Sequence, residues 1–380
     1  MLNFFTDPYP NELLYSALSR YHYYFDNNDT CYAYLELCGS KNKLKKMYYA
    51  NNIKQLVEKL GGTYSAKELL YNHTILPYYQ FFLTEDKLFY AIRNMKNDNL
   101  NLFRSKLLSD FLCLNKQLYY CPKCVLEDVE KFGEAYLHRE HQLEGILICP
   151  IHKVNLKPYN KSEKCNNYKN LIRLDSRKVD LTVQQTFIEL ELERLWDISK
   201  LSYELFTCST KLFINKEILV RYYREKLYEK GFMNHSGVIN LNKLKKELIK
   251  YYGVEVLSRM NSSIDLNGKI TWVDDQFEKN HEFAEPIKHL ILISFLGKNI
   301  NEVINDLSNN YKPFGEGPWL CLNEHCSHYN NKTIEEFETI YDKYSDLPAG
   351  VFKCNICGFT YKRRTNDFSW LNDNLPELEY

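Results

Sequence analysis

The stretch CPKCVLEDVEKFGEAYLHREHQLEGILICPIH, residues 121–152, opens with a Cys-x-x-Cys pair and closes with a Cys-x-x-His pair. Each spacing fits a tight turn that aims two side chains at one point, and Pro122 and Pro150 stiffen both turns. Two such half-sites in close succession are typical of tetrahedral zinc. The alternative is a set of unrelated core thiols. We predict a zinc site formed by Cys121, Cys124, Cys149 and His152.

A second cysteine set lies near the C-terminus and predicts a second zinc ion. Its half-sites are Cys-x4-Cys and Cys-x-x-Cys-Gly, where the glycine lets the backbone fold over the thiolates. The predicted ligands are Cys321, Cys326, Cys354 and Cys357. His325 and His328 compete with Cys326 for one ligand position. Four protein ligands close each site, so we expect both ions to be structural.

The composition restricts the class of protein. The chain has 380 residues, of which 44% are hydrophobic, and 49 Lys and Arg balance 49 Asp and Glu. Nucleic-acid binding would therefore need locally clustered basic residues. The first residues lack the pattern of a signal peptide, and the longest apolar run, 289–296, is too short for a bilayer. These features predict a cytoplasmic protein with reduced cysteines and no membrane partner.

Helical periodicity predicts a mainly α fold in which helix-turn-helix domains alternate with two small zinc modules. The expected segments are a helical region over 1–112, the first zinc module over 113–160, a second helical region over 161–312, the second zinc module over 313–364 and an acidic tail over 365–380. Residues 359–364 are expected to be β-like.

Local signals place individual helices within this plan. A helix is expected over 12–25 with Asn11 as its N-cap, and Ser65 and Glu68 form a predicted capping box. Further helices are expected over 31–38, 53–60, 217–230, 241–252 with Asn240 as N-cap, and 254–260. Residues 286–297 and 299–307 fit helix, tight turn, helix, with Asn301, Glu302, Asn305 and Asp306 outward.

The region 216–260 holds ten Lys and Arg against five Glu, in a chain whose net charge is zero. Such a cluster suits phosphate contacts, although a solvated helix face explains it equally well. The residues predicted to contact DNA are Arg221, Arg224, Lys243, Lys245, Lys246, Lys362, Arg363 and Arg364.

Motifs of common enzymes do not occur in the sequence. It contains no phosphate-binding Gly-x4-Gly-Lys-Ser/Thr loop, no Gly-x-Ser-x-Gly nucleophile turn and no Gly-x-Gly-x-x-Gly fingerprint. His138 and His141 are the only support for a zinc enzyme. We expect a protein that is not an enzyme and has no small-molecule substrate.

Several stretches resemble the TniQ/TnsD proteins, which select target sites for bacterial cut-and-paste transposons. The TniQ-like stretches are DPYPNELLYSALSRYH (7–22), HTILPYY (73–79), LYYCPKC (118–124), YLHREHQL (136–143) and CPIH (149–152). The TnsD-like stretches are YYREKLYEKG (222–231), IKHLILISFLG (287–297), CLNEHC (321–326) and CNICGFTY (354–361).

The resemblance implies site-specific duplex DNA binding and recruitment of an AAA+ ATPase, usually through the N-terminal region, in a bacterial, nucleoid-associated protein. The expected partner-contacting residues are Tyr9, Tyr15, Arg20 and Tyr21, unless these tyrosines pack against the helices of residues 31–60. The alternative function is a protein-only TniQ-type adaptor that links an RNA-guided complex to the ATPase. Longer TnsD-like proteins continue with further DNA-binding helices, whereas this sequence ends at Tyr380.

Overall fold

The structure is a computed structural model, and it describes residues 4–25, 36–37, 53–83, 85–96, 117–159, 171–208, 216–234, 238–267, 270–277, 285–308, 314, 317–341 and 348–364. The chain divides into two compact units, Met1–Leu307 (unit 1) and Ser308–Tyr380 (unit 2). The predicted helix over 31–38 falls almost entirely outside the described residues. The division into five segments stays a prediction.

Unit 1 begins with short helices. They are α1 (Leu14–Tyr24), α3 (Ile53–Lys59), α4 (Ala66–His73), α5 (Leu76–Gln80) and α6 (Glu85–Lys96). The Ser65–Glu68 capping box starts α4 as predicted. Asn11 is not the N-cap of α1: its φ of 56° is left-handed, and the helix begins three residues later. Asparagine tolerates this conformation better than most residues do, because its short polar side chain can form hydrogen bonds with the nearby backbone.

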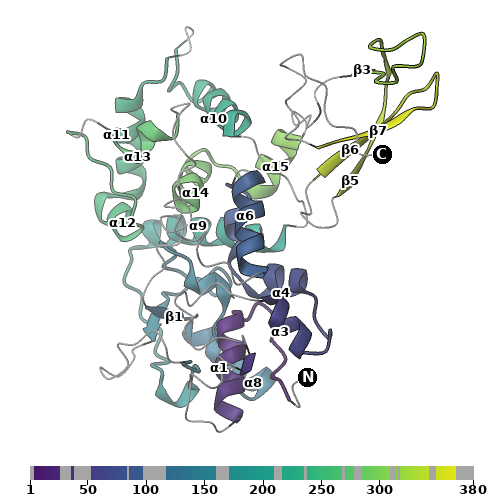
Figure 1. Ribbon diagram of the computed structural model, residues 1–380. Coiled ribbons are helices and arrows are strands. Elements are labelled where there is room, and N and C mark those ends of the chain that lie inside the picture. The colour runs from purple at the N-terminus through teal and green to yellow at the C-terminus, as the bar shows by residue number, and fades with distance from the viewer. Residues whose placement is uncertain are drawn as a thin grey trace. The chain divides into compact units, whose positions relative to one another are not determined.

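The first cysteine-rich segment forms a small α/β layer inside unit 1. Strand β1 (Leu118–Tyr120) pairs antiparallel with β2 (Lys157–Tyr159), with Leu118 opposite Tyr159. Helix α8 (Pro122–Phe132) starts directly after Cys121, because a proline in the first turn needs no hydrogen-bond acceptor. The short 3-10 helix η2 (Arg139–Gln142) follows. In Figure 1, α1 is the purple helix that follows the N-terminus.

The second half of unit 1 is helical. Its elements are η4 (Ser176–Lys178), α9 (Glu189–Thr207), α10 (Lys216–Glu229), α11 (Leu241–Tyr252), α12 (Val254–Arg259), α13 (Trp272–Asp275), α14 (Pro286–Phe295) and α15 (Ile300–Ser308). Helix α11 has the predicted bounds, and its N-cap Asn240 accepts from the Lys243 N–H at 3.0 Å. The apolar helix α14 packs on α9. Gly297, with φ of 73°, forms the turn between α14 and α15.

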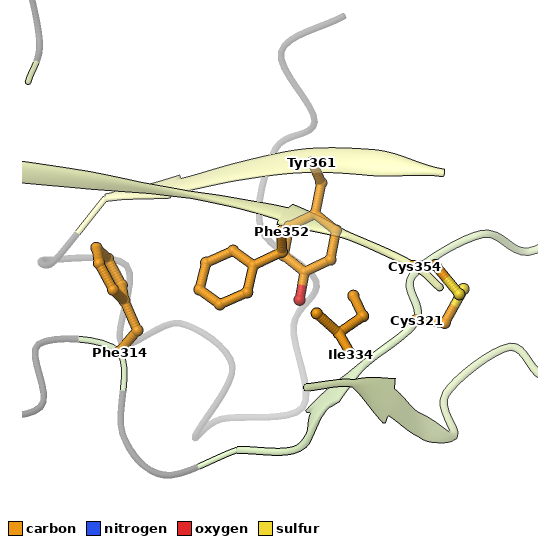
Figure 2. Close-up of a cluster of buried hydrophobic side chains, with 6 residues drawn as sticks. All are labelled: Phe314, Cys321, Ile334, Phe352, Cys354 and Tyr361. Carbon is orange, nitrogen blue, oxygen red and sulfur yellow. The ribbon is translucent and has the colours of Figure 1, made fainter. Parts of the chain in front are cut away.

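Unit 2 is built from β-strands. Strands β3 (Trp319–Leu320) and β4 (Lys332–Ile334) form one antiparallel pair, and β5 (Phe337–Tyr341), β6 (Pro348–Lys353) and β7 (Thr360–Arg364) form a three-stranded antiparallel sheet. The predicted strand over 359–364 is present, but the other strands were not predicted. Figure 2 shows the core that these strands enclose, which consists of Phe314, Cys321, Ile334, Phe352, Cys354 and Tyr361.

None of the helices in the described ranges is long and apolar enough to cross a membrane.

Candidate metal centres and nucleic-acid interface

The first metal centre brings together the four residues that the sequence predicted. The donor atoms of Cys121, Cys124, Cys149 and His152 all lie within 4.8 Å of one another. Cys121 precedes α8 and Cys124 lies in its first turn, whereas Cys149 and His152 come from the turn before β2. The three thiols are buried, and the imidazole is half-buried. Residues 125–148 separate the two half-sites, and the antiparallel pairing of β1 with β2 joins the strands that flank them.

The dimensions of this cluster fit a tetrahedral zinc ion. With Zn–S near 2.3 Å and Zn–N near 2.05 Å, tetrahedral geometry places two sulfurs about 3.8 Å apart and a sulfur and a nitrogen about 3.6 Å apart. The Cys124 and Cys149 sulfurs are 3.7 Å apart. The Nδ1 atom of His152 lies 3.6, 3.2 and 3.7 Å from the sulfurs of Cys121, Cys124 and Cys149.

Neighbouring groups orient these donors. Glu127, on α8, accepts a hydrogen bond from His152 Nε2 at 2.8 Å, which leaves Nδ1 free to bind a metal. The indole of Trp196, on α9, donates to the Pro150 carbonyl at 2.9 Å and fixes the second turn. The centre therefore has the outer-shell contacts that metal sites in proteins use to hold a histidine in one tautomer.

The two histidines of the HREH run lie beside this centre and form a different buried cluster. His138 contacts Asp128 at 3.0 Å and Glu140 at 3.2 Å. Burial opposes its charge, but these two hydrogen bonds outweigh burial and raise the pKa of His138 to about 10. Burial and the charge of His138 lower the pKa of His141 to about 4, so that imidazole is neutral. His141 Nε2 lies 3.9 Å from Cys124 Sγ.

The second metal centre gathers five donors. The ligand atoms of Cys321, Cys326, His328 and Cys357 lie within 4.8 Å of one another. Cys321 Sγ is 3.7 Å from both Cys326 and Cys357, which again fits two ligands of one zinc ion. Cys354 Sγ lies 3.3 Å from His328 Nε2, and Figure 2 places Cys354 beside Cys321 at one end of the core.

Cys354 is prepared to act as a thiolate. Burial opposes its ionisation, but hydrogen bonds from the backbone N–H groups of Cys357 and Ile356 outweigh burial and lower the pKa of Cys354 to about 5. The Cys-x-x-Cys-Gly turn supplies these donors, and Gly358 at φ 73° permits the fold-over. Both centres thus have the donors of structural zinc sites.

The first zinc module is joined to α1 by backbone and side-chain contacts. Leu13 N–H donates to the Leu137 carbonyl at 2.9 Å, and Leu137 N–H donates to Ser16 Oγ at 3.0 Å. Arg20, buried, contacts Glu12 at 2.7 Å and Glu134 at 2.9 Å. The N-terminal helix is therefore an integral part of the layer that holds the first metal centre.

This packing corrects the predicted partner-contacting residues. Tyr15 is 4% exposed, Arg20 3% and Tyr21 1%, so their side chains belong to the interior of unit 1. Tyr9 is half-buried, lies under the Arg20 guanidinium at 3.9 Å and donates to Glu134 at 3.2 Å. The prediction treated these aromatic residues as an interface. Instead, the rings of Phe4, Phe5 and Phe25 pack on Tyr21. The Ile172 N–H donates to the Tyr15 hydroxyl at 3.0 Å.

The predicted DNA-contacting residues of the helical region divide into three groups. Lys243 and Lys246 are exposed on α11. Lys245 is a correction: it is 4% exposed and its ammonium lies 2.6 Å from Asp274, so it has no access to a phosphate. Arg224 is half-buried, and the side chain of Arg221 falls outside the described part of α10.

The basic residues after the second centre also differ from one another. Lys362 is exposed on β7. Arg363 donates to the Phe314 carbonyl at 3.1 Å and lies 5.7 Å from the Phe352 ring centre, so it contributes to the core of unit 2. The side chain of Arg364 is not among those described.

Sequence reasoning missed the residues that support the centres. Glu127 follows Cys124 by three positions on α8, a spacing that puts both on one helix face and could have indicated the contact to His152. The ion pairs of Arg20 with Glu134 and of Lys245 with Asp274 join distant parts of the chain. The periodicity of apolar residues within one segment does not predict which residue of a distant segment will form an ion pair with it.

Comparison with known proteins gives two family matches. The TniQ family model matches residues 3–156, and the model described as Tn7-like transposition protein D matches residues 198–373. The chain is 27% identical over 157 residues to the transposon Tn7 transposition protein TnsD of Escherichia coli. That match covers 39% of this chain and 30% of the relative's own length.

Proposed function

Because the chain belongs to the TniQ/TnsD family of transposition proteins, we propose that it selects the insertion site of a bacterial Tn7-like cut-and-paste transposon. In this role it binds duplex DNA at the site, recruits the AAA+ transposition ATPase and performs no catalysis itself. The observation that carries the proposal is the succession of a TniQ match and a TnsD match along one chain.

Two zinc ions hold the scaffold in this proposal. The first is bound by Cys121, Cys124, Cys149 and His152, and the second by the cysteine cluster of unit 2. Sulfur and imidazole donors at these separations suit Zn²⁺ better than the oxygen-preferring Mg²⁺ or Ca²⁺. When bound, the ions cross-link the turns that carry the ligands. The chemistry they supply is structural.

Helix α11 provides the best-supported DNA-contacting surface of unit 1. Lys243, Lys246 and Lys250 are all exposed and follow one another at intervals of three and four residues, so they share one helix face. Their nearest acidic neighbour on the helix, Glu247, is 3.8 Å from Lys250. In unit 2 the exposed Lys362 on β7 adds a further cation. Long basic side chains on one face suit phosphate contacts.

Binding to duplex DNA of the insertion site, measured over a range of salt concentrations, tests this surface. Each lysine that contacts a phosphate contributes about one unit to the salt slope. Lys243→Gln with Lys246→Gln should therefore lower the slope by about two units. The matched control, Lys54→Gln with Lys123→Gln, removes two exposed charges elsewhere and should leave the slope unchanged.

An unchanged slope in the α11 variant would reject this surface. A chain that binds the DNA only in the presence of an RNA-guided complex would favour the adaptor function instead. Both results are visible in the same titration, because the adaptor would show no salt-dependent binding when the chain is alone with DNA.

Recruitment of the ATPase is proposed for the N-terminal region, through residues other than those predicted first. Phe4 and Phe25 are 49% and 42% exposed, and both rings stack with the buried Tyr21, at centroid distances of 6.0 and 5.5 Å. Exposed aromatic rings held by a rigid neighbour are frequent at interface centres. Phe4→Ser with Phe25→Ser should weaken capture of the ATPase in the presence of ATP and DNA, while DNA binding by the chain persists.

A further inference from the structure

The second metal centre contains one more donor than a tetrahedral zinc ion uses. Cys321, Cys326, Cys357 and His328 form one compact set of four, and Cys354 contacts His328 directly at 3.3 Å. Structural zinc takes four protein ligands. With five donors around one position, at least one remains outside the coordination sphere at any time.

We propose that His328 and Cys354 are alternative fourth ligands of the second zinc ion, which Cys321, Cys326 and Cys357 bind in both cases. The proposal rests on the presence of zinc at this centre, as argued above. In one ligand set Cys354 completes four thiolates. In the other set His328 completes three thiolates and one imidazole. Each set has the four ligands that zinc needs.

The backbone holds His328 beside the thiols. The loop from Cys321 to Asn331 closes on itself: Cys321 N–H donates to the Asn331 carbonyl at 2.9 Å, and Asn330 N–H donates to the Cys321 carbonyl at 2.8 Å. Within it, Asn331 N–H donates to the His328 carbonyl at 3.0 Å. The imidazole is therefore within reach of the metal position without any unfolding of the loop.

Backbone hydrogen bonds also fix the position of Cys354. Its N–H donates to the Phe359 carbonyl at 2.8 Å, and its carbonyl accepts from Gly358 N–H at 2.9 Å. Its side chain is 1% exposed and lies 3.3 Å from Thr333 Oγ1. Since both candidates are preorganised, a change of ligand requires only a side-chain movement, and loss of one donor leaves the other in place.

The two ligand sets differ in charge. A thiolate brings a negative charge to the metal and a neutral imidazole brings none, so the set with His328 is one unit less negative. Unit 2 exposes Lys332, Lys353 and Lys362. The ligand set therefore alters the charge at the metal position by one unit. The net charge of unit 2 changes with it when the released Cys354 takes up a proton.

Zinc content of the full-length chain and the spectrum of its Co²⁺ form test the proposal. Wild type should bind about two zinc ions. Cys354→Ala and His328→Ala should each still bind about two, whereas the double variant should fall to about one. In the Co²⁺ form, Cys354→Ala should lose part of the sulfur-to-cobalt absorption but keep the visible bands of tetrahedral cobalt.

Two controls make the comparison specific. Cys321→Ala with Cys357→Ala removes two shared ligands, leaves three donors and should fall to about one zinc ion. His325→Ala in the Cys354→Ala background removes an exposed neighbouring imidazole and should leave about two. The first centre provides an internal standard in every sample, because its ligands are unchanged.

The results that overturn the proposal are distinct from those that remove its premise. If Cys354→Ala loses the second ion as completely as the variant with both Cys321→Ala and Cys357→Ala does, His328 does not replace Cys354 as the fourth ligand. If the double variant keeps both ions, neither residue is needed. A wild-type chain with only the first ion would instead disprove zinc at the second centre, and the variants would not be needed to show it.

Discussion

The guanidinium of Arg20 is buried between two carboxylates, those of Glu12 and Glu134. A buried ion pair adds little net stability relative to apolar residues of the same shape, because both charges lose their hydration. Removing one member is far more costly, since its partners remain buried without compensation. Arg20 therefore determines whether α1 stays on the first zinc module.

Replacing this arginine should destabilise unit 1. Arg20→Met leaves Glu12 and Glu134 without their counter-charge and should lower the free energy of unfolding by about 3 kcal/mol. Urea unfolding followed by circular dichroism measures the change. Arg177→Met, which removes an exposed arginine paired with Asp175, should leave the unfolding curve where it is. Equal curves for wild type and Arg20→Met would show that the pair is not formed in solution.

The cysteines and the nearby histidine of the first centre should respond differently to substitution. Cys124→Ser removes a thiolate ligand, so the first module should lose its zinc and its fold. His141→Ala removes a neutral imidazole that lies 3.9 Å from Cys124 and outside the four-donor set, so the zinc should be retained. Metal analysis of the two purified variants distinguishes them, and zinc loss from His141→Ala would make that residue a ligand.

Helices α11 and α13 are connected by a buried pair that contributes stability in a defined pH range. Burial alone would raise the pKa of Asp274, but hydrogen bonds from Lys245 and Thr271 outweigh it and lower the pKa below its ordinary value of 3.8. A lowered carboxyl pKa stabilises the fold above the unfolded-state value. This contribution is lost as the pH falls through the folded-state value.

Asp274→Asn should therefore destabilise the chain at neutral pH, by about 3 kcal/mol, because Lys245 stays buried without a partner. The difference in the free energy of unfolding between this variant and wild type should stay constant down to about pH 4 and become smaller at lower pH. Urea unfolding monitored by circular dichroism gives both quantities, and zinc release at acid pH affects both proteins alike. Adding Lys245→Met to the variant should recover part of the loss; no recovery would show that the two residues act independently.

Gly145 is located where the first module meets the second group of helices. Its φ is +77°, and an added Cβ would lie 2.9 Å from Ile287 Cγ1 and 3.1 Å from the Met260 carbonyl oxygen. Gly145→Ala should cost about 1–2 kcal/mol for the left-handed conformation and a further 1–3 kcal/mol for the crowding. Gly133, with φ of +81° and no neighbour within 4 Å, is the matched control for conformation alone.

In thermal unfolding, the melting temperature of Gly145→Ala should lie well below that of Gly133→Ala. If the two variants melt together, the crowding is relieved by a shift of α14, and the contact between the module and that helix is loose.

The elements that were predictable are those with complete local signals. Asn240 as N-cap and the apolar period give α11 with its observed bounds, and the Ser65 capping box starts α4. The burial of Tyr15 and Tyr21 could be named only as the alternative to an interface, because a helical period gives the apolar face of a helix but not the segment that covers it. In unit 2, strands β3 and β4 are two and three residues long and show no alternation to detect.

Most ligands of the candidate metal centres were also predictable from local sequence. Cysteine and histidine spacing is itself the constraint that a tetrahedral ion imposes, so residues 121–152 contain nearly all the information about the first centre. His328 could be named only as a competitor, because two residues after Cys326 there is no half-site spacing to assign it. Its position beside Cys354 depends on how the loop of residues 321–331 closes.

At the scale of the whole molecule, each compact unit contains its own metal centre. Loss of one ion should therefore leave the other unit folded. Cys321→Ser with Cys357→Ser leaves three donors, so it should reduce the zinc content from about two ions to about one. The helical circular dichroism should stay nearly unchanged, because the helices of the described residues lie in unit 1. A parallel loss of helical signal would mean that the two units depend on each other for folding.

The contact between the N-terminal segment and the first module also fixes an order of events during synthesis. Tyr136 donates to the Pro10 carbonyl across 126 positions of the chain. At about 5–20 residues per second, a ribosome needs roughly 6–25 seconds to translate that interval. The segment before α1 therefore leaves the exit tunnel well before its partner exists. Until then the apolar faces of α1 are uncovered, which makes the nascent chain a substrate for chaperones that hold the N-terminus.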